Sequence, residues 1–200
     1  VAALTTEQVQ ALKTTQVAAL KTAQVVALTT EQVVALTTAQ AKALTTAAVA
    51  ALTTEQVAAI ETVDVEVLST AQVQALTTAG VAALTTAQVQ ALTTGQVASV
   101  KTTQVAALTT DQVVAITTAQ AQALSTAAVA TLDTAQLGAL ETTDLAVFNA
   151  GQIGAIKASQ AAGLTTDQIA SLSTVQIQSV STAVVAALDT VQSGARETVD

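Results

Sequence analysis

The chain has 200 residues, of which 51% are hydrophobic and 10% are charged, and its formal net charge at pH 7 is −8. It contains no Cys, His, Trp, Tyr, Met or Pro. This composition lacks the side chains of the usual metalloenzymes, thiol enzymes and histidine enzymes, and its negative charge disfavours binding to nucleic-acid phosphates. The sequence also shows no nucleophile–base pair and no glycine-rich phosphate loop, so we expect a protein that is not an enzyme and carries no cofactor.

One eight-residue phrase, typified by ALTTEQVV at 27–34, repeats along the whole chain. An apolar residue recurs at every eighth position from Leu4 to Leu188, and no insertion or deletion interrupts the count. The second Thr, the Gln two residues after it, the following Val and a small residue recur almost as regularly. Such a short fixed period is typical of a solenoid, in which the constant columns face the interior and the variable columns face water.

The first octad predicts a short helix over about residues 6–11. Thr5 suits the N-cap, Gln8 completes a capping box three residues later, and Leu4 and Val9 have the spacing of a hydrophobic staple. The second Thr column is nevertheless more constant than the first. One interpretation is that the first Thr is the N-cap. The other is that the second Thr is the cap or is buried between coils. The capping pattern favours the first Thr.

A continuous helix does not fit the octad, because eight residues advance an α-helix by about 800°, which is about 80° beyond two turns. Each octad is therefore predicted to be one short helix and a corner at Leu-Thr-Thr, which gives an all-α solenoid. The alternative is a β-solenoid, because Thr and Val favour strands. Abundant Ala, the low Gly count of 7 and the recurring capping signals favour the helical form.

The octads are most regular over residues 1–60, and the phrase then becomes acidic as Glu61-Thr62-Val63-Asp64, with Asp in the Gln column. This variant recurs at Glu141–Asp144 and at Glu197–Asp200. Carboxylates at this spacing make Glu61, Asp64, Glu141 and Asp144 candidate calcium ligands. The alternative, which the sequence favours because calcium takes six or more oxygens, is that Asp replaces Gln in capping and Glu lies at a solvated corner.

The Gln10 column is predicted to be exposed, yet it carries almost no charge and includes Val26, Val34 and Val114. Exposed apolar residues of this kind indicate association, so we expect these valines to mediate self-association into filaments or bundles. The alternative is that they are half-buried against the next coil.

The phrase degenerates from about residue 145 onward, and Arg196 takes the place of the core Leu. Terminal repeats of solenoids are often atypical because they face water, so we expect one continuous array over residues 1–200. The chain begins and ends within an octad, which suggests a window of a longer protein. Its longest apolar runs have about six residues, far below the length of a membrane span, so no membrane insertion is expected.

The tandem phrase ALTTxQVx resembles repeat regions of very large bacterial surface and secreted proteins of the adhesin-like or biofilm-matrix kind, and of some filament-forming extracellular proteins. The resemblance implies the structural shaft of an extracellular or cell-surface bacterial fibre, filament or adhesin. The alternative is a ligand-binding repeat module, for ice, a glycan or calcium. Thermal stabilisation by added calcium would favour an ion-binding module, whereas concentration-dependent fibres would favour the shaft.

Overall fold

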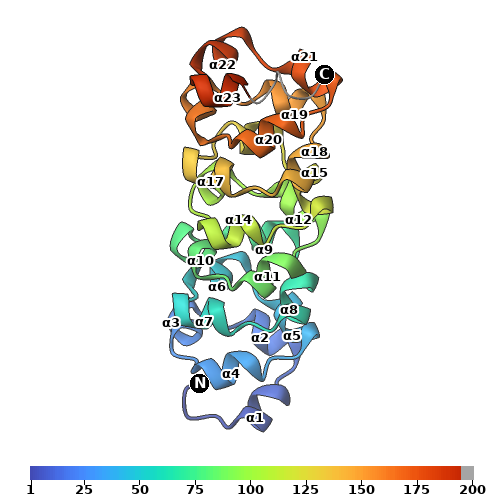
Figure 1. Cartoon of the computed structure of the whole chain (residues 1–200). Coiled ribbons are helices and arrows are strands. Elements are labelled where there is room, and N and C mark those ends of the chain that lie inside the picture. The colour runs from blue at the N-terminus through green and yellow to red at the C-terminus, as the bar shows by residue number, and fades with distance from the viewer. Residues whose placement is uncertain (195–200) are drawn as a thin grey trace. The chain divides into compact units, whose positions relative to one another are not determined.

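The computed structural model describes residues 1–194, which form short helices and, within that range, no β-strand. The all-α solenoid predicted from the octad is therefore confirmed, and the β-solenoid alternative was wrong. The chain divides into two compact units, Val1–Val100 and Lys101–Asp200. Figure 1 shows the helices of each unit, which follow one another at every octad.

The first unit contains α1 (Thr6–Gln10), α2 (Thr14–Ala18), α3 (Thr22–Val26), α4 (Thr30–Val34), α5 (Thr38–Ala43), α6 (Thr46–Ala51), α7 (Thr54–Ala59), α8 (Thr62–Val67), α9 (Thr70–Ala75), α10 (Thr78–Ala83), α11 (Thr86–Ala91) and α12 (Thr94–Ser99). The second contains α13 (Thr102–Val105), α14 (Thr110–Val114), α15 (Thr118–Ala123), α16 (Thr126–Val129), α17 (Thr134–Ala139), α18 (Thr142–Ala146), α19 (Ala150–Gly154), the 3₁₀-helix η1 (Ala158–Gly163), α20 (Thr166–Ala170), α21 (Thr174–Ser179), α22 (Thr182–Ala187) and α23 (Thr190–Gly194).

The first Thr of the octad is the N-cap, as its sequence pattern predicted. At α4, Thr29 has extended backbone angles (φ −76°, ψ 163°), and its Oγ1 accepts a hydrogen bond from the N–H of Gln32 at 3.2 Å. The Oε1 of Gln32 in turn accepts from the N–H of Thr29 at 2.9 Å, which completes the capping box. Where Lys occupies the cap, as at Lys13 and Lys21, the second of these two bonds remains. The Gln therefore keeps the helix start in place even without a capping hydroxyl.

The helix ends because the Leu of the octad takes an extended conformation. Leu44 (φ −60°, ψ 131°) and Thr45 (φ −71°, ψ 158°) are consecutive extended residues, and together they form the corner between α5 and α6. Among the described residues none has a positive φ. The corner thus needs neither Gly nor Pro, which explains how a chain with so many turns contains so few glycines and no proline.

Within each unit, a helix packs against the helix three octads away. In the first unit α2 contacts α5, α3 contacts α6 and α4 contacts α7. Figure 1 shows α4, α7 and α10 at successive levels of this unit. In the second unit the same relation joins α14 to α17 and α19 to α21. Because each octad supplies one helix, one coil contains about three octads.

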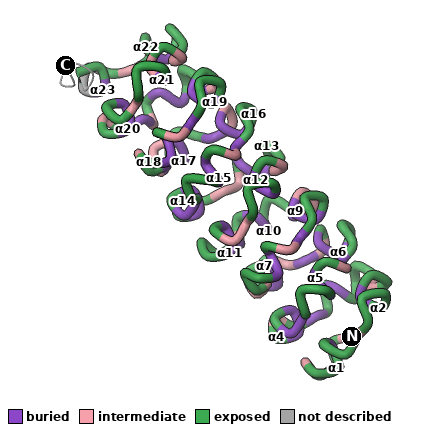
Figure 2. The backbone as a smooth tube through the Cα atoms, turned by 90° about the vertical axis from the view of Figure 1, so that its right-hand side faces the viewer, coloured by how far each residue is buried: buried purple, intermediate pink, exposed green. Residues whose placement is uncertain are grey.

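The core lies on the inner side of the coils, where Figure 2 shows the buried residues of each octad. The Val and Leu columns form it: Val33 is 2% exposed and Leu36 is 8% exposed. Full burial of one such side chain contributes about 1.5–3 kcal/mol to stability. The prediction that the constant columns face the interior is confirmed for the Val and Leu columns and wrong for the second Thr, which is mostly exposed. Each octad stabilises the fold by covering its neighbours.

The octads after residue 145 keep this architecture although their sequence degenerates. Phe148 occupies a Leu position and is 3% exposed, and the one helix of 3₁₀ type among residues 1–194 is η1. Arg196 and the acidic variant at Glu197–Asp200 lie outside the described residues. None of the helices in the described part of the chain combines the length and apolarity needed to cross a membrane.

Candidate functional site

The Gln of the octad connects its helix to the preceding coil. On α7, the Nε2 of Gln56 donates to the carbonyl oxygens of Val25 and Leu28, both at 2.8 Å, and approaches that of Val26 at 3.3 Å. Its Oε1 accepts from the N–H of Thr53 at 2.9 Å. The side chain is 2% exposed, yet both ends of its amide are satisfied. The sequence predicted the contact within the octad and missed the contact between coils.

This contact, which we call the Gln clamp, repeats along both units. In the first unit the Nε2 lies 2.6–2.8 Å from the carbonyl oxygen 28 residues earlier, at Gln32, Gln40, Gln56, Gln72, Gln88 and Gln96. In the second unit that distance is 2.6–3.0 Å, at Gln136, Gln152, Gln160, Gln168, Gln176 and Gln192. One acceptor lies at the end of a helix, where the Val25 carbonyl also accepts from the N–H of Leu28 at 3.0 Å, and the other is the Leu carbonyl at the following corner. Each clamp therefore satisfies polar groups of one coil with a side chain of the next.

The acidic variants place a carboxyl group where the Gln clamp would be. Asp64 on α8 is 2% exposed and Asp144 on α18 is 1% exposed. One oxygen of each, Oδ1 of Asp64 and Oδ2 of Asp144, has no hydrogen-bond partner. Asp is one methylene shorter than Gln, and its ionised form has no hydrogen to donate. The Gln clamp is therefore missing at these two residues, as it is where Ala48 and Ala128 occupy the column.

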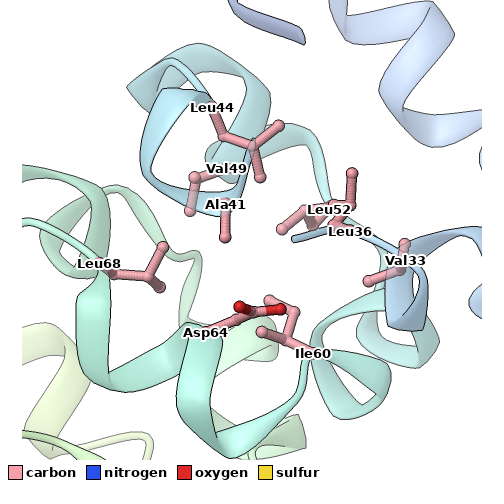
Figure 3. Close-up of a pocket in the computed structure, with 9 residues that line it drawn as sticks. All are labelled: Val33, Leu36, Ala41, Leu44, Val49, Leu52, Ile60, Asp64 and Leu68. Carbon is pink, nitrogen blue, oxygen red and sulfur yellow. The ribbon is translucent and has the colours of Figure 1, made fainter. Parts of the chain in front are cut away.

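Asp64 points into a small cavity whose other lining side chains are apolar, as Figure 3 shows. The lining residues are Val33, Leu36, Ala41, Leu44, Val49, Leu52, Ile60, Asp64 and Leu68. The cavity volume is about 10 Å³, which is about the space that one water molecule requires. A charge on Asp64 is therefore removed from bulk water.

The pKa of both buried aspartates is raised. Burial raises the pKa of Asp64 from 3.8 to about 6, and the nearby charge of Glu61 adds to the effect. Burial also raises the pKa of Asp144. A hydrogen bond from the Thr118 side chain opposes this increase in pKa, and the charge of Glu141 reinforces it. Both carboxyl groups thus hold a proton more tightly in the folded protein than an exposed Asp does.

The four predicted calcium ligands lie in contrasting environments. Glu61 and Glu141 are exposed, whereas Asp64 and Asp144 are buried. Residues 1–194 contain no group of three or more His, Cys, Asp or Glu side chains placed to hold a metal ion. Each variant contributes two carboxylates, fewer oxygens than calcium takes. Calcium binding at these residues stays a prediction that no contact in the structure supports.

The valines predicted to mediate association are exposed, by 48% at Val26, 44% at Val34 and 48% at Val114. About half of each side chain's surface is therefore open to solvent, and self-association through these valines stays a prediction. Val26 lies on α3, which packs against α6, and Val34 lies on α4, which packs against α7. The α3–α6 pair and the α4–α7 pair are separate series of packed helices in the first unit, so Val26 and Val34 lie on different series.

Sequence analysis missed three other exposed valines, one of which, Val185, is 40% exposed although it occupies the constant Val column. Val63 is 51% exposed and Val175 is 64% exposed. Both occupy the variable column directly after the second Thr, so an aliphatic residue in that column was the available signal.

Comparison with known families gives one match. A family model described as the ALTTAQ repeat matches residues 1–38, 57–94, 94–126 and 137–174, which together make up more than half of the chain. No curated protein and no solved structure matches the chain. The matched segments include helices with the capping box and the Gln clamp, so the phrase that defines the repeat is the one that builds these contacts.

Proposed function

Because the chain belongs to the ALTTAQ repeat family, we propose that it is a structural shaft built from stacked coils. The Gln clamp carries this proposal, since it recurs at fixed spacing and joins each coil to the one before it. We place the shaft in an extracellular or cell-surface bacterial fibre, filament or adhesin because the tandem phrase resembles repeat regions of such proteins.

The mechanism of such a shaft is mechanical. Each coil contributes the same buried Val and Leu columns and the same clamps, so its stability depends on its own octads and on its nearest neighbours. Adding a coil adds one helix-to-helix spacing, about 8–10 Å, to the length of a unit. The number of octads thereby sets the distance that the shaft spans.

Insertion of one coil tests this mechanism. A second copy of residues 29–52, placed between Leu52 and Thr53, adds 24 residues and preserves both the octad and the three-octad packing. We expect the maximum dimension measured by small-angle X-ray scattering to increase by about 8–10 Å, with no loss of thermal stability.

The matched control inserts a copy of residues 29–48 at the same place. These 20 residues shift every later Leu and Gln out of the octad register, so we expect a lower melting temperature. Equal behaviour of the two insertions, or an unchanged dimension with the 24-residue copy, would show that stacked octads do not set the length.

Self-association of the shaft is the second part of the proposal, and the exposed valines support it. Changing Val26, Val34 and Val114 to Thr keeps the branched shape and replaces one methyl group of each side chain with a hydroxyl group. We expect association, measured by sedimentation velocity over a range of protein concentrations, to weaken by about tenfold or more, because apolar burial between copies is lost. The same changes at Val9, Val17 and Val25, which are 0–1% exposed, should instead lower the melting temperature. Unaltered sedimentation of the exposed triple variant would place the contact elsewhere.

A further inference from the structure

The backbone opposite each buried Asp is arranged for a hydrogen-bond donor. The Gln clamp directs an N–H group toward carbonyl oxygens 31, 30 and 28 residues earlier, as Gln56 does. For Asp64 the residues at these spacings are Val33, Val34 and Leu36, and Val33 and Leu36 line its cavity. An ionised carboxylate offers lone pairs and no hydrogen, so it cannot replace the donor that these carbonyls receive from a Gln.

The surroundings of Asp64 do not compensate a negative charge. The cavity has room for about one water molecule, which is too little to hydrate a carboxylate, and its remaining lining side chains are apolar. The charged residues on α8 itself are Glu61 and Glu66, both exposed. On the neighbouring helices, α4 contributes Glu31, α5 contributes the exposed Lys42, and α11 contributes none. No ion pair to Asp64 occurs among the described residues.

Asp144 in the second unit is likewise buried and has one oxygen without a hydrogen-bond partner. Its own helix contributes Glu141, α14 contributes Asp111 and α20 contributes Asp167. The packed helix α15 contributes the Thr118 hydroxyl group and no charged side chain. Every charged residue on these helices is negative, so protonation is the available way to neutralise Asp144.

We infer that Asp64 and Asp144 are proton-dependent locks, each of which keeps its helix packed on the preceding coil when the carboxyl group is neutral and weakens that packing when it is ionised. The neutral form carries an O–H group and no net charge, so it suits a buried site such as the apolar cavity at Asp64. The ionised form leaves a buried charge without hydration or a counter-ion. The shaft therefore tightens as the solution becomes more acidic.

The pH window follows from the direction of the pKa change. The folded protein holds the proton of Asp64 with a pKa of about 6, above the ordinary value of 3.8. A raised folded pKa means that the stabilising contribution is fully present below about pH 4 and is lost as the pH rises through about 6. This is opposite in sign to Glu7, whose own backbone N–H and the Thr5 hydroxyl group lower its pKa.

The test compares the full chain with its Asp64→Gln/Asp144→Gln variant, which supplies the residue that most octads carry at this position. Thermal unfolding is followed by circular dichroism between pH 4 and pH 8. We expect the variant to melt about 3–8 °C higher at pH 8 and to show almost no difference near pH 4. Glu7→Gln is the control, and it should not raise the melting temperature at pH 8.

A second measurement identifies the titrating groups. Carboxyl carbon-13 NMR of protein labelled at Asp should show Asp64 titrating with a midpoint near pH 6. A midpoint near pH 4 for both aspartates would overturn the inference. A melting difference that is the same at pH 4 and pH 8 would do so as well, because it would show that Gln stabilises the coil independently of protonation.

Discussion

Replacing Gln56 by Ala is expected to lower the free energy of unfolding by about 2–4 kcal/mol. The change removes two hydrogen bonds of 2.8 Å to the preceding coil and the acceptor of the Thr53 N–H. It also leaves a cavity, because the side chain is 2% exposed. Chemical denaturation followed by far-UV circular dichroism measures the loss.

Gln16→Ala is the matched control for Gln56→Ala. Gln16 makes the same bond within its octad, from the N–H of Lys13 at 2.8 Å, but its side chain is exposed. We expect a loss of about 0.5–1 kcal/mol, which is the effect of helix capping alone. If the two variants lose equal stability, the bonds between coils do not stabilise the fold. The sequence itself shows that single clamps are dispensable, since Ala48 and Ala128 occupy this column in formed helices.

Gly163→Ala is the second substitution with a large expected effect, a loss of about 1–3 kcal/mol. Gly163 ends η1 where its backbone approaches α17, and a Cβ atom there would lie 2.7 Å from the Cα of Thr134 and also against the Thr134 carbonyl oxygen. Gly138 on α17 is equally close to the backbone of η1, because a Cβ on Gly138 would lie 2.6 Å from the carbonyl oxygen of Gly163. Both obstacles are backbone atoms, so relief requires the two helices to move apart.

Gly95→Ala provides the control for this steric argument. A Cβ on Gly95 meets no atom within 4 Å, and the residue lies in the first turn of α12. The substitution should raise stability by about 0.5–1 kcal/mol because Ala restricts the unfolded chain and favours the helix. Thermal unfolding of both variants separates the effects. Stabilisation by both alanines would show that η1 and α17 tolerate a wider separation.

The local structure was predictable from the sequence because each octad carries its own signals. The capping box at Thr5 and Gln8 and the apolar columns at Leu4 and Val9 involve residues within one octad, so their spacing is visible in the chain. The structure confirms the helix start, the corner and the inward Val and Leu columns. The second Thr was wrongly expected inside, because constancy alone does not distinguish a core residue from an exposed first residue of a helix.

The contacts between coils were not predictable in the same way. Nearly identical octads give no sign of whether a helix packs against its third or its fourth successor, so the coil size and the Gln clamp came from the structure. One weak signal exists: Glu7, Glu31 and Glu55 are spaced by 24 residues, the length of one coil. Asp64 lies in the Gln column, so its burial could be inferred only after the structure had shown that this column is interior.

Hydrogen exchange of the glutamine side-chain amides tests the stacking of coils most directly. In full-length protein labelled with nitrogen-15 at Gln, the Nε2 hydrogens of Gln56 bond to Val25 and Leu28, whereas Gln16 is exposed to solvent. The account predicts that the Gln56 amide exchanges with water at least about a hundredfold more slowly than the Gln16 amide, because its exchange requires the two coils to separate. Equally fast exchange at both glutamines would contradict it.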